Sequence, residues 1–244
     1  MSKERRILRV SGPDAEHFLQ GLVTNDVTKL KDGLVYTALL TPQGKYRADF
    51  FLVPSGEDIL IDVAADLADD LVRALTLYKL RSKVSIDETG IAVSRGTGSP
   101  PEGAFADPRD PRMGWRGYAG QPGEEADWDA LRVAACVPES GIELTPDTFI
   151  LEAGFGRLNG VDFRKGCYVG QEVTARMKHK TELRKGLATV EVEGNAPVGT
   201  GILSGEKQAG TLYTQADGHG IAYLRFDRAG DEMRAADATV RYTP

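Results

Sequence analysis

The segment RKGCYVGQEVTARMKHK, residues 164–180, gathers side chains capable of chemistry around one of the two cysteines of the chain. Cys167 stands between Gly166 and Gly170, and glycines permit unusual backbone angles and close approach to a ligand. A helix beginning just after the cysteine would place the thiol at a helix N-terminus near Lys165, and both features stabilise a thiolate. Cys167 could therefore be a nucleophile, a metal ligand, a redox thiol or a small residue in a tight turn. From the residues alone, a reactive thiol and a buried structural thiol both stay open.

A cluster of basic residues surrounds this cysteine in an otherwise acidic chain. Such a cluster can hold a polyanion, which could be a nucleic-acid backbone, a set of phosphates or a chain of carboxylates. A solvated surface is the common alternative. The cluster consists of Arg164, Lys165, Arg176, Lys178, His179, Lys180, Arg184 and Lys185.

Two acidic residues interrupt apolar stretches. Asp49 lies within YRADFFLV, and Glu152 lies within FILEAGF. Burying a carboxylate is costly unless a partner is provided. Each acid therefore either lies on a solvated strand face or points into a cavity, where it could accept hydrogen bonds from a polar heterocycle.

The overall composition restricts the function classes. The chain has 244 residues, a formal net charge of −6 and 41% hydrophobic residues, as in an ordinary globular protein. With Cys136 and Cys167 alone, neither a disulfide framework nor a four-cysteine cluster site can form within one chain. The histidines, His17, His179 and His219, have no partner at metal-ligand spacing, so no metal site is predicted. The acidic net charge argues against a general nucleic-acid binder.

The residue pattern also predicts where in the cell the protein is located. No apolar run approaches the roughly 18–20 residues that cross a bilayer, so we expect no membrane partner. The opening MSKERRILRVSG lacks the apolar core of a signal peptide. We therefore expect a cytoplasmic protein.

Hydrophobic periodicity predicts a mixed α+β chain. We expect helices at about 13–23, 66–79 and 128–136, with Cys136 as a small core residue of the last helix. A hairpin is predicted at 34–40 and 46–53, with further strands at 58–63, 82–88 and 91–95. Residues 96–126, rich in Gly and Pro, are predicted to be an exposed connector or a crossing between domains. From about residue 183, short alternating runs separated by turns predict a small β-barrel or sandwich.

KGCYVGQE, residues 165–172, resembles the signature of the YgfZ family of folate-binding, iron–sulfur-cluster-assembly proteins. That family is related to the aminomethyltransferase (T-protein) of the glycine cleavage system. GPDAEHFLQGLVTNDV, LLTPQGKYRADFFL, LYKLRSKVSI, DPRDPRMGW and TFILEAGF occur in the order expected for the family, so the resemblance covers nearly the whole chain.

The resemblance implies a T-protein-like fold of three subdomains around a central channel. Residues 1–182 would form a folate-binding region of two interleaved α+β subdomains, the middle one at about 42–110, and residues 183–244 a small β-barrel. The implied ligand is tetrahydrofolate in mono- or polyglutamyl form, with Asp49, Glu152 and Arg176 at its site.

The resemblance also implies a function. The chain would be a tetrahydrofolate-binding accessory protein that supports assembly or repair of iron–sulfur clusters in client enzymes, through Cys167. The motif residues are Lys165, Gly166, Cys167, Tyr168, Gly170, Gln171 and Glu172. Its partners would be iron–sulfur client enzymes or assembly proteins. The alternative is a tetrahydrofolate-dependent one-carbon transferase, which Ala48-Asp49 after Gly-Lys disfavours, because the T-protein pattern has adjacent acids there. An RNA-binding module is least favoured.

Overall fold

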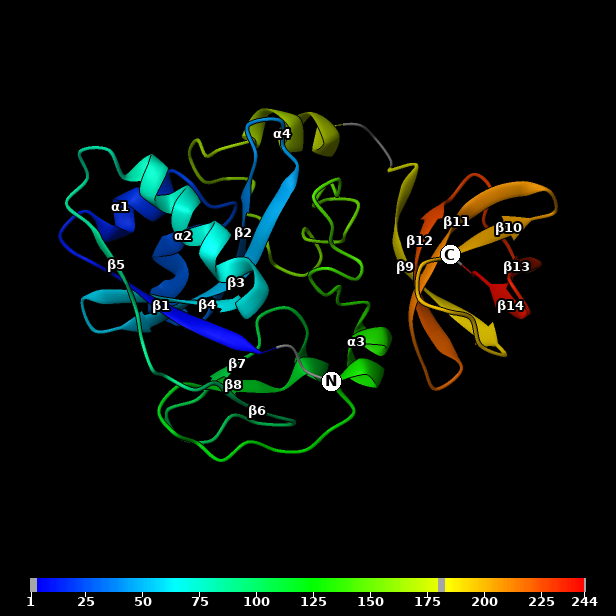
Figure 1. Cartoon of the computed structure of the whole chain (residues 1–244), viewed down its shortest axis with the longest axis horizontal. Helices are drawn as coiled ribbons and strands as arrows, with labels where there is room; N and C mark the ends of the chain where they lie inside the picture. The colour runs from blue at the N-terminus through cyan, green and yellow to red at the C-terminus, as the bar shows by residue number, and fades with distance from the viewer. Residues whose placement is uncertain (1–3, 180–182, 244) are drawn as a thin grey trace.

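A five-stranded antiparallel sheet organises the N-terminal part of the chain (Figure 1). The computed structural model describes residues 4–179 and 183–243. The strand order is β2-β3-β4-β1-β5, and the bounds are β1 Arg5–Ser11, β2 Val35–Leu40, β3 Tyr46–Ser55, β4 Asp58–Ala64 and β5 Ser85–Glu88. The predicted hairpin and the strand that follows it are confirmed. Both β2 and β4 are buried along most of their length, which explains why they read as continuous apolar runs.

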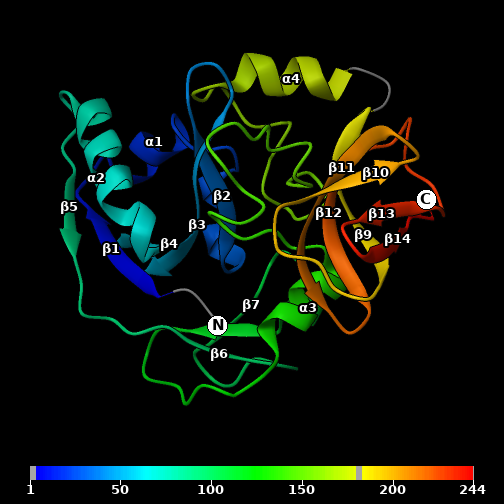
Figure 2. The ribbon, with the colours of Figure 1, turned by 45° about the vertical axis from the view of Figure 1, so that its right-hand side comes forward.

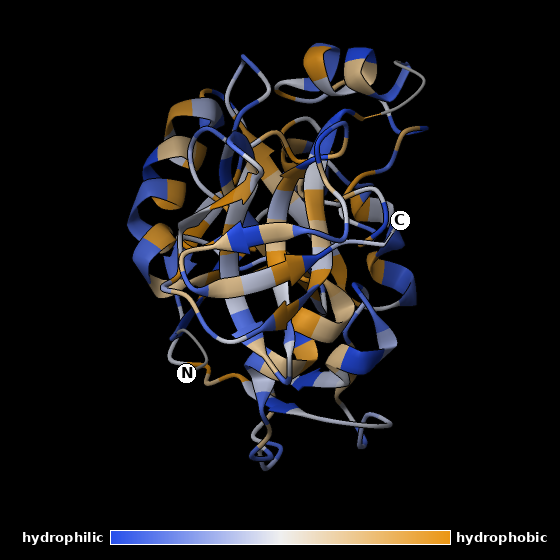
Figure 3. Cartoon of the chain, turned by 90° about the vertical axis from the view of Figure 1, so that its right-hand side faces the viewer, coloured by the Kyte–Doolittle hydropathy of each residue, from blue (hydrophilic) through white to orange (hydrophobic). Residues whose placement is uncertain are grey.

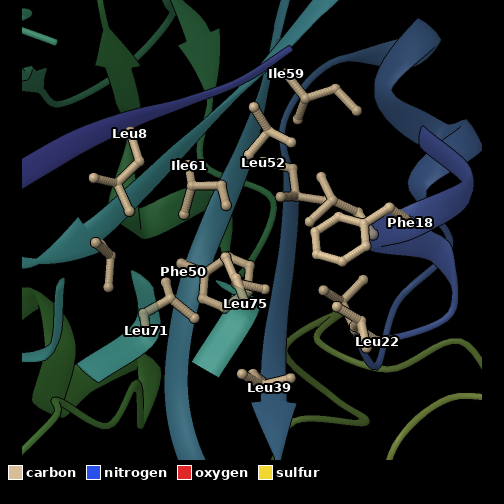
Figure 4. Close-up of a cluster of buried hydrophobic side chains, with 14 of the residues drawn as sticks. Leu8, Phe18, Leu22, Leu39, Phe50, Leu52, Ile59, Ile61, Leu71 and Leu75 are labelled. Atoms are coloured by element: carbon tan, nitrogen blue, oxygen red, sulfur yellow. The ribbon is translucent and has the colours of Figure 1, made fainter. Parts of the chain in front are cut away.

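Two helices cover the first face of this sheet. They are α1 (Ala15–Gln20) and α2 (Ala65–Lys79), so α1 is shorter than predicted and α2 agrees with the prediction. Leu71 and Leu75 of α2 pack with Phe18 of α1 against Phe50 and neighbouring strand residues (Figure 4). A short 3-10 helix, η1 (Val27–Asp32), follows α1.

The second face of the sheet carries polar residues as well as apolar ones. The β2–β3 register shifts between Leu39 and Leu40, so β3 contains an irregularity near its start. Side chains on a regular strand alternate between faces, and a bulge interrupts that alternation. Tyr46 and Asp49 therefore lie on the same face, three residues apart, although regular pleating would separate them.

Only the middle of the segment predicted to be an exposed connector, residues 104–118, is folded against this second face, whereas residues 97–103 and most of 119–125 are exposed, so the prediction is wrong for the middle alone. It contains β7 (Phe105–Ala106), the 3-10 helix η2 (Pro111–Met113) and β8 (Trp115–Gly117). Strand β8 pairs with β7 and with β6 (Ser94–Gly96), which gives the order β6-β8-β7. Strands of two or three residues are too short to produce a hydrophobic period, which hides them in the sequence. Helix α3 (Trp128–Ala135) follows, and Cys136 after it is buried as predicted.

The C-terminal part is a closed six-stranded barrel, which confirms the predicted barrel and the α+β class. The strand order is β10-β11-β12-β9-β14-β13, with bounds β9 Lys185–Glu193, β10 Thr200–Ser204, β11 Lys207–Ala216, β12 His219–Arg225, β13 Met233–Ala235 and β14 Ala238–Arg241. Apolar and polar residues alternate along these strands, and the apolar ones fill the barrel (Figure 3).

Helix α4 (Gln171–His179) lies at the end of the molecule opposite the β6-β8-β7 sheet (Figures 1 and 2). Of the helices within the described ranges, none is both long and apolar enough to cross a membrane.

Candidate functional site

The loop that carries Cys167 is anchored by the lysine two residues before it. Lys165 is buried, and its ammonium donates to the backbone oxygens of Gln20 at 2.8 Å, Val23 at 2.6 Å and Asn25 at 2.8 Å. An ammonium has three N–H donors, so these carbonyls engage all of them. Burial lowers the pKa of Lys165 to about 8, although the nearby carboxylates oppose the shift. Within the described residues, the ammonium of Lys165 thus donates to backbone carbonyls and not to the thiol of Cys167.

Other groups fix the same loop on both sides of the cysteine. Asp162 accepts the backbone N–H of Arg164 at 2.7 Å and that of Lys165 at 3.2 Å. Tyr168 is buried in the core beneath the second face of the sheet. Cys167 itself is exposed. The loop is thus held firmly while its thiol faces solvent.

Glycines determine how α4 packs next to this loop. Gly170 has φ +82°, and a Cβ there would lie 2.6 Å from the backbone oxygen of Thr41. Gly44, in the turn of the β2–β3 hairpin, has φ +74° and would collide with Val173 in the same way. Only glycine allows the helix start to approach the hairpin this closely. The helix begins at Gln171, four positions after Cys167.

The basic cluster of the sequence is divided by the structure. Arg164, Arg176, Lys178, His179 and Arg184 are exposed, and Lys185 is partly buried at the start of β9. Lys165 belongs to the loop anchor, and Lys180 lies outside the described residues. Exposed Arg176 lies on α4, the helix that begins four positions after Cys167.

Asp49 lies on the second face of the sheet and is buried. Its carboxylate accepts hydrogen bonds from Tyr36 at 3.0 Å, Tyr46 at 2.7 Å and Ser140 at 2.6 Å. Burial and the Asp49 charge raise the pKa of both tyrosines well above the ordinary value. Burying a carboxylate removes its hydrogen bonds to water, and three protein hydroxyls replace them here, which offsets the free-energy cost of burial.

Glu152 occupies a different place. Tyr223 of β12 donates to the Glu152 carboxylate at 2.6 Å, and the backbone oxygen of Glu152 accepts the N–H of Leu187 at 2.7 Å. Glu152 therefore joins the body of the chain to the barrel. Burial, followed by the bond to Glu152, raises the pKa of Tyr223.

The predicted site residues are not brought together. Asp49 lines a small cavity with Ser140, but Glu152, Arg176 and Cys167 are not part of its wall. Arg95 of β6 and Arg116 of β8 line the cavity, whereas α4 lies at the opposite end of the molecule (Figures 1 and 2).

Arginines that the sequence reasoning missed dominate this cavity. Its wall includes Arg5, Arg95, Arg109, Arg116 and Arg132. Three of them come from segment 95–116, most of which was predicted to be exposed, so their charge gave no sign of burial. DPRDPRMGW, whose alternating charges and prolines do not resemble a solvated run of one sign, was the signal that could have identified part of this set.

Two buried carboxylates hold the arginines in place. Asp62 pairs with Arg5 at 2.6 Å and with Arg116 at 2.8 Å, and Asp107 pairs with Arg109 at 2.7 Å and with Arg116 at 3.3 Å. Burial alone would raise the pKa of Asp107, but the charge and hydrogen bonds of Arg109, assisted by Arg116, lower it to about 2.

Tetrahydrofolate does not fit this cavity. The space is about 40 Å³, whereas small-molecule pockets measure about 300–1,000 Å³. The oxygens of Asp49 already accept three hydrogen bonds from protein hydroxyls. In this structure the space beside Asp49 is therefore too small for a pterin.

Residues 184–244 match the family described as CAF17, C-terminal beta-barrel domain. The iron–sulfur cluster assembly factor IBA57 of Mus musculus is 31% identical, over 91% of this chain and 75% of that protein. The Homo sapiens protein of the same name is 33% identical, over 82% of this chain and 68% of its own length. This chain belongs to the IBA57 family. The YgfZ resemblance thus indicated the right broad family under the name of its bacterial relatives.

Other comparisons extend this assignment. The IBA57 homologue of Pyricularia oryzae is 35% identical over 75% of this chain, which spans 54% of that protein, about half its length. The glycine cleavage system aminomethyltransferase T of Bartonella henselae has the same fold, with a TM-score of 0.74 over 97% of this chain and 81% of that chain at 15% identity. The predicted T-protein-like fold is confirmed.

The IBA57 relatives also correct one expectation. The proteins of Mus musculus, Homo sapiens and Pyricularia oryzae are named as mitochondrial. The expectation of a cytoplasmic protein is therefore wrong. It rested on the lack of a signal peptide for secretion, a criterion that does not address mitochondrial targeting.

Proposed function

We propose that this chain supports the assembly of iron–sulfur clusters by offering the Cys167 thiol as one ligand to a cluster carried by a partner protein. The observation that carries the proposal is an exposed thiol on a loop that buried Lys165 anchors through three hydrogen bonds. The IBA57 relatives, named as iron–sulfur cluster assembly factors, support the reaction class.

The number of cysteines in this chain determines how many cluster ligands a partner protein must supply. Iron–sulfur clusters are held by cysteine thiolates, typically four for each cluster. Of the two cysteines in the chain, Cys136 is buried and Cys167 is exposed. Burial raises the pKa of the Cys136 thiol, which makes it the weaker ligand. The remaining ligands would therefore come from a client enzyme or an assembly protein, and the cluster is cargo.

The anchored loop gives this transfer a physical basis. A thiol on a fixed loop loses little conformational freedom when it binds a cluster, so more of the binding free energy is retained. The exposed cations of α4, including Arg176, belong to the helix that follows the Cys167 loop and would attract a partner with an acidic surface before contact.

The proposal is tested by replacing each cysteine in turn. Cys167→Ala is expected to abolish the activation of a four-iron client enzyme, measured after reconstitution with iron, sulfide and the client's own assembly proteins. Cys136→Ala, which removes the buried thiol, is the matched control and is expected to retain activation. Client activity at the wild-type level with Cys167→Ala would refute the proposal.

Tetrahydrofolate binding is a separate proposal that derives from the resemblance. The cavity beside Asp49 would have to widen for a pterin to enter, and Glu152 would have to exchange Tyr223 for the ligand. Calorimetry with mono- and polyglutamyl tetrahydrofolate on the wild type and Glu152→Ala decides it. Saturable heat that the variant loses supports the proposal, and absence of heat with the wild type contradicts it.

A further inference from the structure

An aromatic side chain is exposed on the loop that carries Cys167. Among the large apolar side chains that are exposed within the described ranges, Phe163 is the one aromatic, with a relative exposure of 44%. One side of its ring lies against Gly156, where an added Cβ would be 3.7 Å from a ring carbon. The ammonium of Lys178 on α4 lies 4.9 Å from the ring centre. The rest of the ring is open to a partner.

The backbone on both sides of Phe163 is fixed. Before the ring, Asp162 donates its N–H to the backbone oxygen of Thr24 at 3.0 Å. After it, the Asp162 carboxylate accepts the N–H groups of Arg164 and Lys165, and three carbonyls hold the Lys165 ammonium. A side chain on an immobilised backbone loses less conformational freedom when it binds. Fixed aromatic side chains of this kind dominate the binding free energy of many protein interfaces.

Phe163 is close enough to Cys167 to share one interface with it. Phe163 precedes the cysteine by four positions, so their Cα atoms are at most about 14 Å apart. A protein interface that buries about 800 Å² of each partner extends roughly 16 Å from its centre. Both side chains are exposed. A protein that placed a cluster on the thiol would therefore come within reach of the ring.

The exposed charges that follow the ring are mainly positive. Along residues 163–178 the exposed charged side chains are Glu172, Arg164, Arg176 and Lys178. These carry three positive charges and one negative charge, whereas the whole chain has a net charge of −6. Asp162 does not cancel the excess, because its carboxylate already pairs with Lys29 at 2.7 Å. A complementary surface on a partner is therefore acidic.

We propose that Phe163 is the apolar anchor on which the cluster-carrying partner docks, and that this partner presents an apolar pocket for the ring, bordered by carboxylates. This inference rests on the function proposed above, in which the cluster of that partner takes Cys167 as a ligand. Phe163 makes no bond to the cluster and acts on the affinity between the two proteins. The neighbouring cations accelerate association, and the buried ring slows dissociation.

The experiment measures docking without the cluster ligand. The Cys167→Ala chain is titrated by calorimetry with the four-iron client enzyme and, separately, with each of its assembly proteins. We expect saturable binding of one of them, and Phe163→Ala in the same background should raise that Kd at least about tenfold. Phe163→Tyr keeps the ring and should bind within about twofold of Phe163. Leu203→Ala on β10, where the leucine is 46% exposed, is the matched control and should leave the Kd unchanged.

Two further measurements separate docking from loop structure and from charge. The rate at which iodoacetamide alkylates Cys167 should be the same with Phe163→Ala as with the wild type, and a changed rate would show that the ring holds the loop instead. Lys178→Gln should lower the association rate severalfold at low salt and less at high salt. Arg73→Gln, which removes an exposed arginine of α2, should leave that rate unchanged.

The outcomes that overturn this inference differ from those that refute the role of the thiol. An unchanged Kd with Phe163→Ala, or no saturable binding of the client enzyme or its assembly proteins, overturns the docking role of the ring. A dimer of the chain alone that Phe163→Ala dissociates, seen in sedimentation, would assign the ring to a second copy and also overturns it. Client activation at the wild-type level by Cys167→Ala refutes the role of the thiol alone.

Discussion

Replacing Lys165 with methionine tests the account of the Cys167 loop most directly. The substitution keeps an unbranched chain of similar length but removes the donors to three backbone oxygens, those of Gln20, Val23 and Asn25. Leaving a buried acceptor without a donor costs about 1–3 kcal/mol. At the lower end for each of three carbonyls, the free energy of unfolding should fall by about 3 kcal/mol.

The expected size of the change is measurable by thermal unfolding. A loss of 1 kcal/mol lowers the Tm of a domain of this size by about 2–4 °C, so Lys165→Met should lower it by roughly 6–12 °C. Lys178→Met on α4 is the matched control. That side chain is exposed and lies over Phe163 at 4.9 Å, so its removal should cost no more than about 1 kcal/mol.

A pH series adds a second measurement on the same variant. With its pKa at about 8 against an ordinary 10.5, native Lys165 releases its proton before the unfolded chain does. Between these values the unfolded state binds more protons, so the stability contributed by this group rises with pH. Lys165→Met should lose that rise. A Tm within about 2 °C of the wild type, with an unchanged pH dependence, would refute the anchoring role.

Three further predictions concern other parts of the molecule. Cys167→Ser should change the free energy of unfolding by no more than about 0.5 kcal/mol, because the side chain is exposed, while abolishing alkylation of the native chain by iodoacetamide. The pKa of Asp107 is lowered from 3.8 to about 2, so this carboxylate should contribute about 2 kcal/mol of stability above pH 3.8. That contribution should be lost as the pH falls towards 2. A midpoint near 3.8 in a carbon-13 titration of the Asp107 carboxyl group would contradict this. Glu143 is buried, pairs with Arg132 at 3.3 Å and accepts a hydrogen bond from Thr214 of β11 at 2.5 Å. Because Glu143→Ala leaves the buried Arg132 without this partner, it should destabilise the chain by about 3 kcal/mol in urea unfolding. A loss equal to that of the exposed Glu193→Ala would contradict this.

Residue patterns within single segments were sufficient to predict much of the fold. The hairpin around TPQGK, helix α2 and the alternating strands of the barrel each depend on periodicity within one short segment. The prediction of an exposed connector at 96–126 failed in the middle of the segment, because the order there does not depend on periodicity within one short segment. Its strands are two or three residues long, and its order comes from arginines that pair with carboxylates elsewhere, such as Arg116 with Asp62 at a separation of 54 residues.

The sequence identified residues of the candidate site, but it did not predict how they are arranged in space. Cys167 was identified by its motif, and its exposure is a structural finding. Asp49 and Glu152 were selected as acids in apolar stretches, yet one accepts hydroxyls beside a cavity and the other joins the barrel. No sequence pattern states which face of a sheet a residue occupies after a bulge.

The sequence by itself determined the family motif, the number of cysteines and the α+β composition, because these are properties of residue types and of spacing within single segments. Only the tertiary structure decided what Lys165 does. Its ammonium meets carbonyls about 140 residues away in sequence, such as that of Asn25, and those contacts exist only once the chain has folded. The same long-range packing paired Arg5 and Arg116 with Asp62, which no local pattern records.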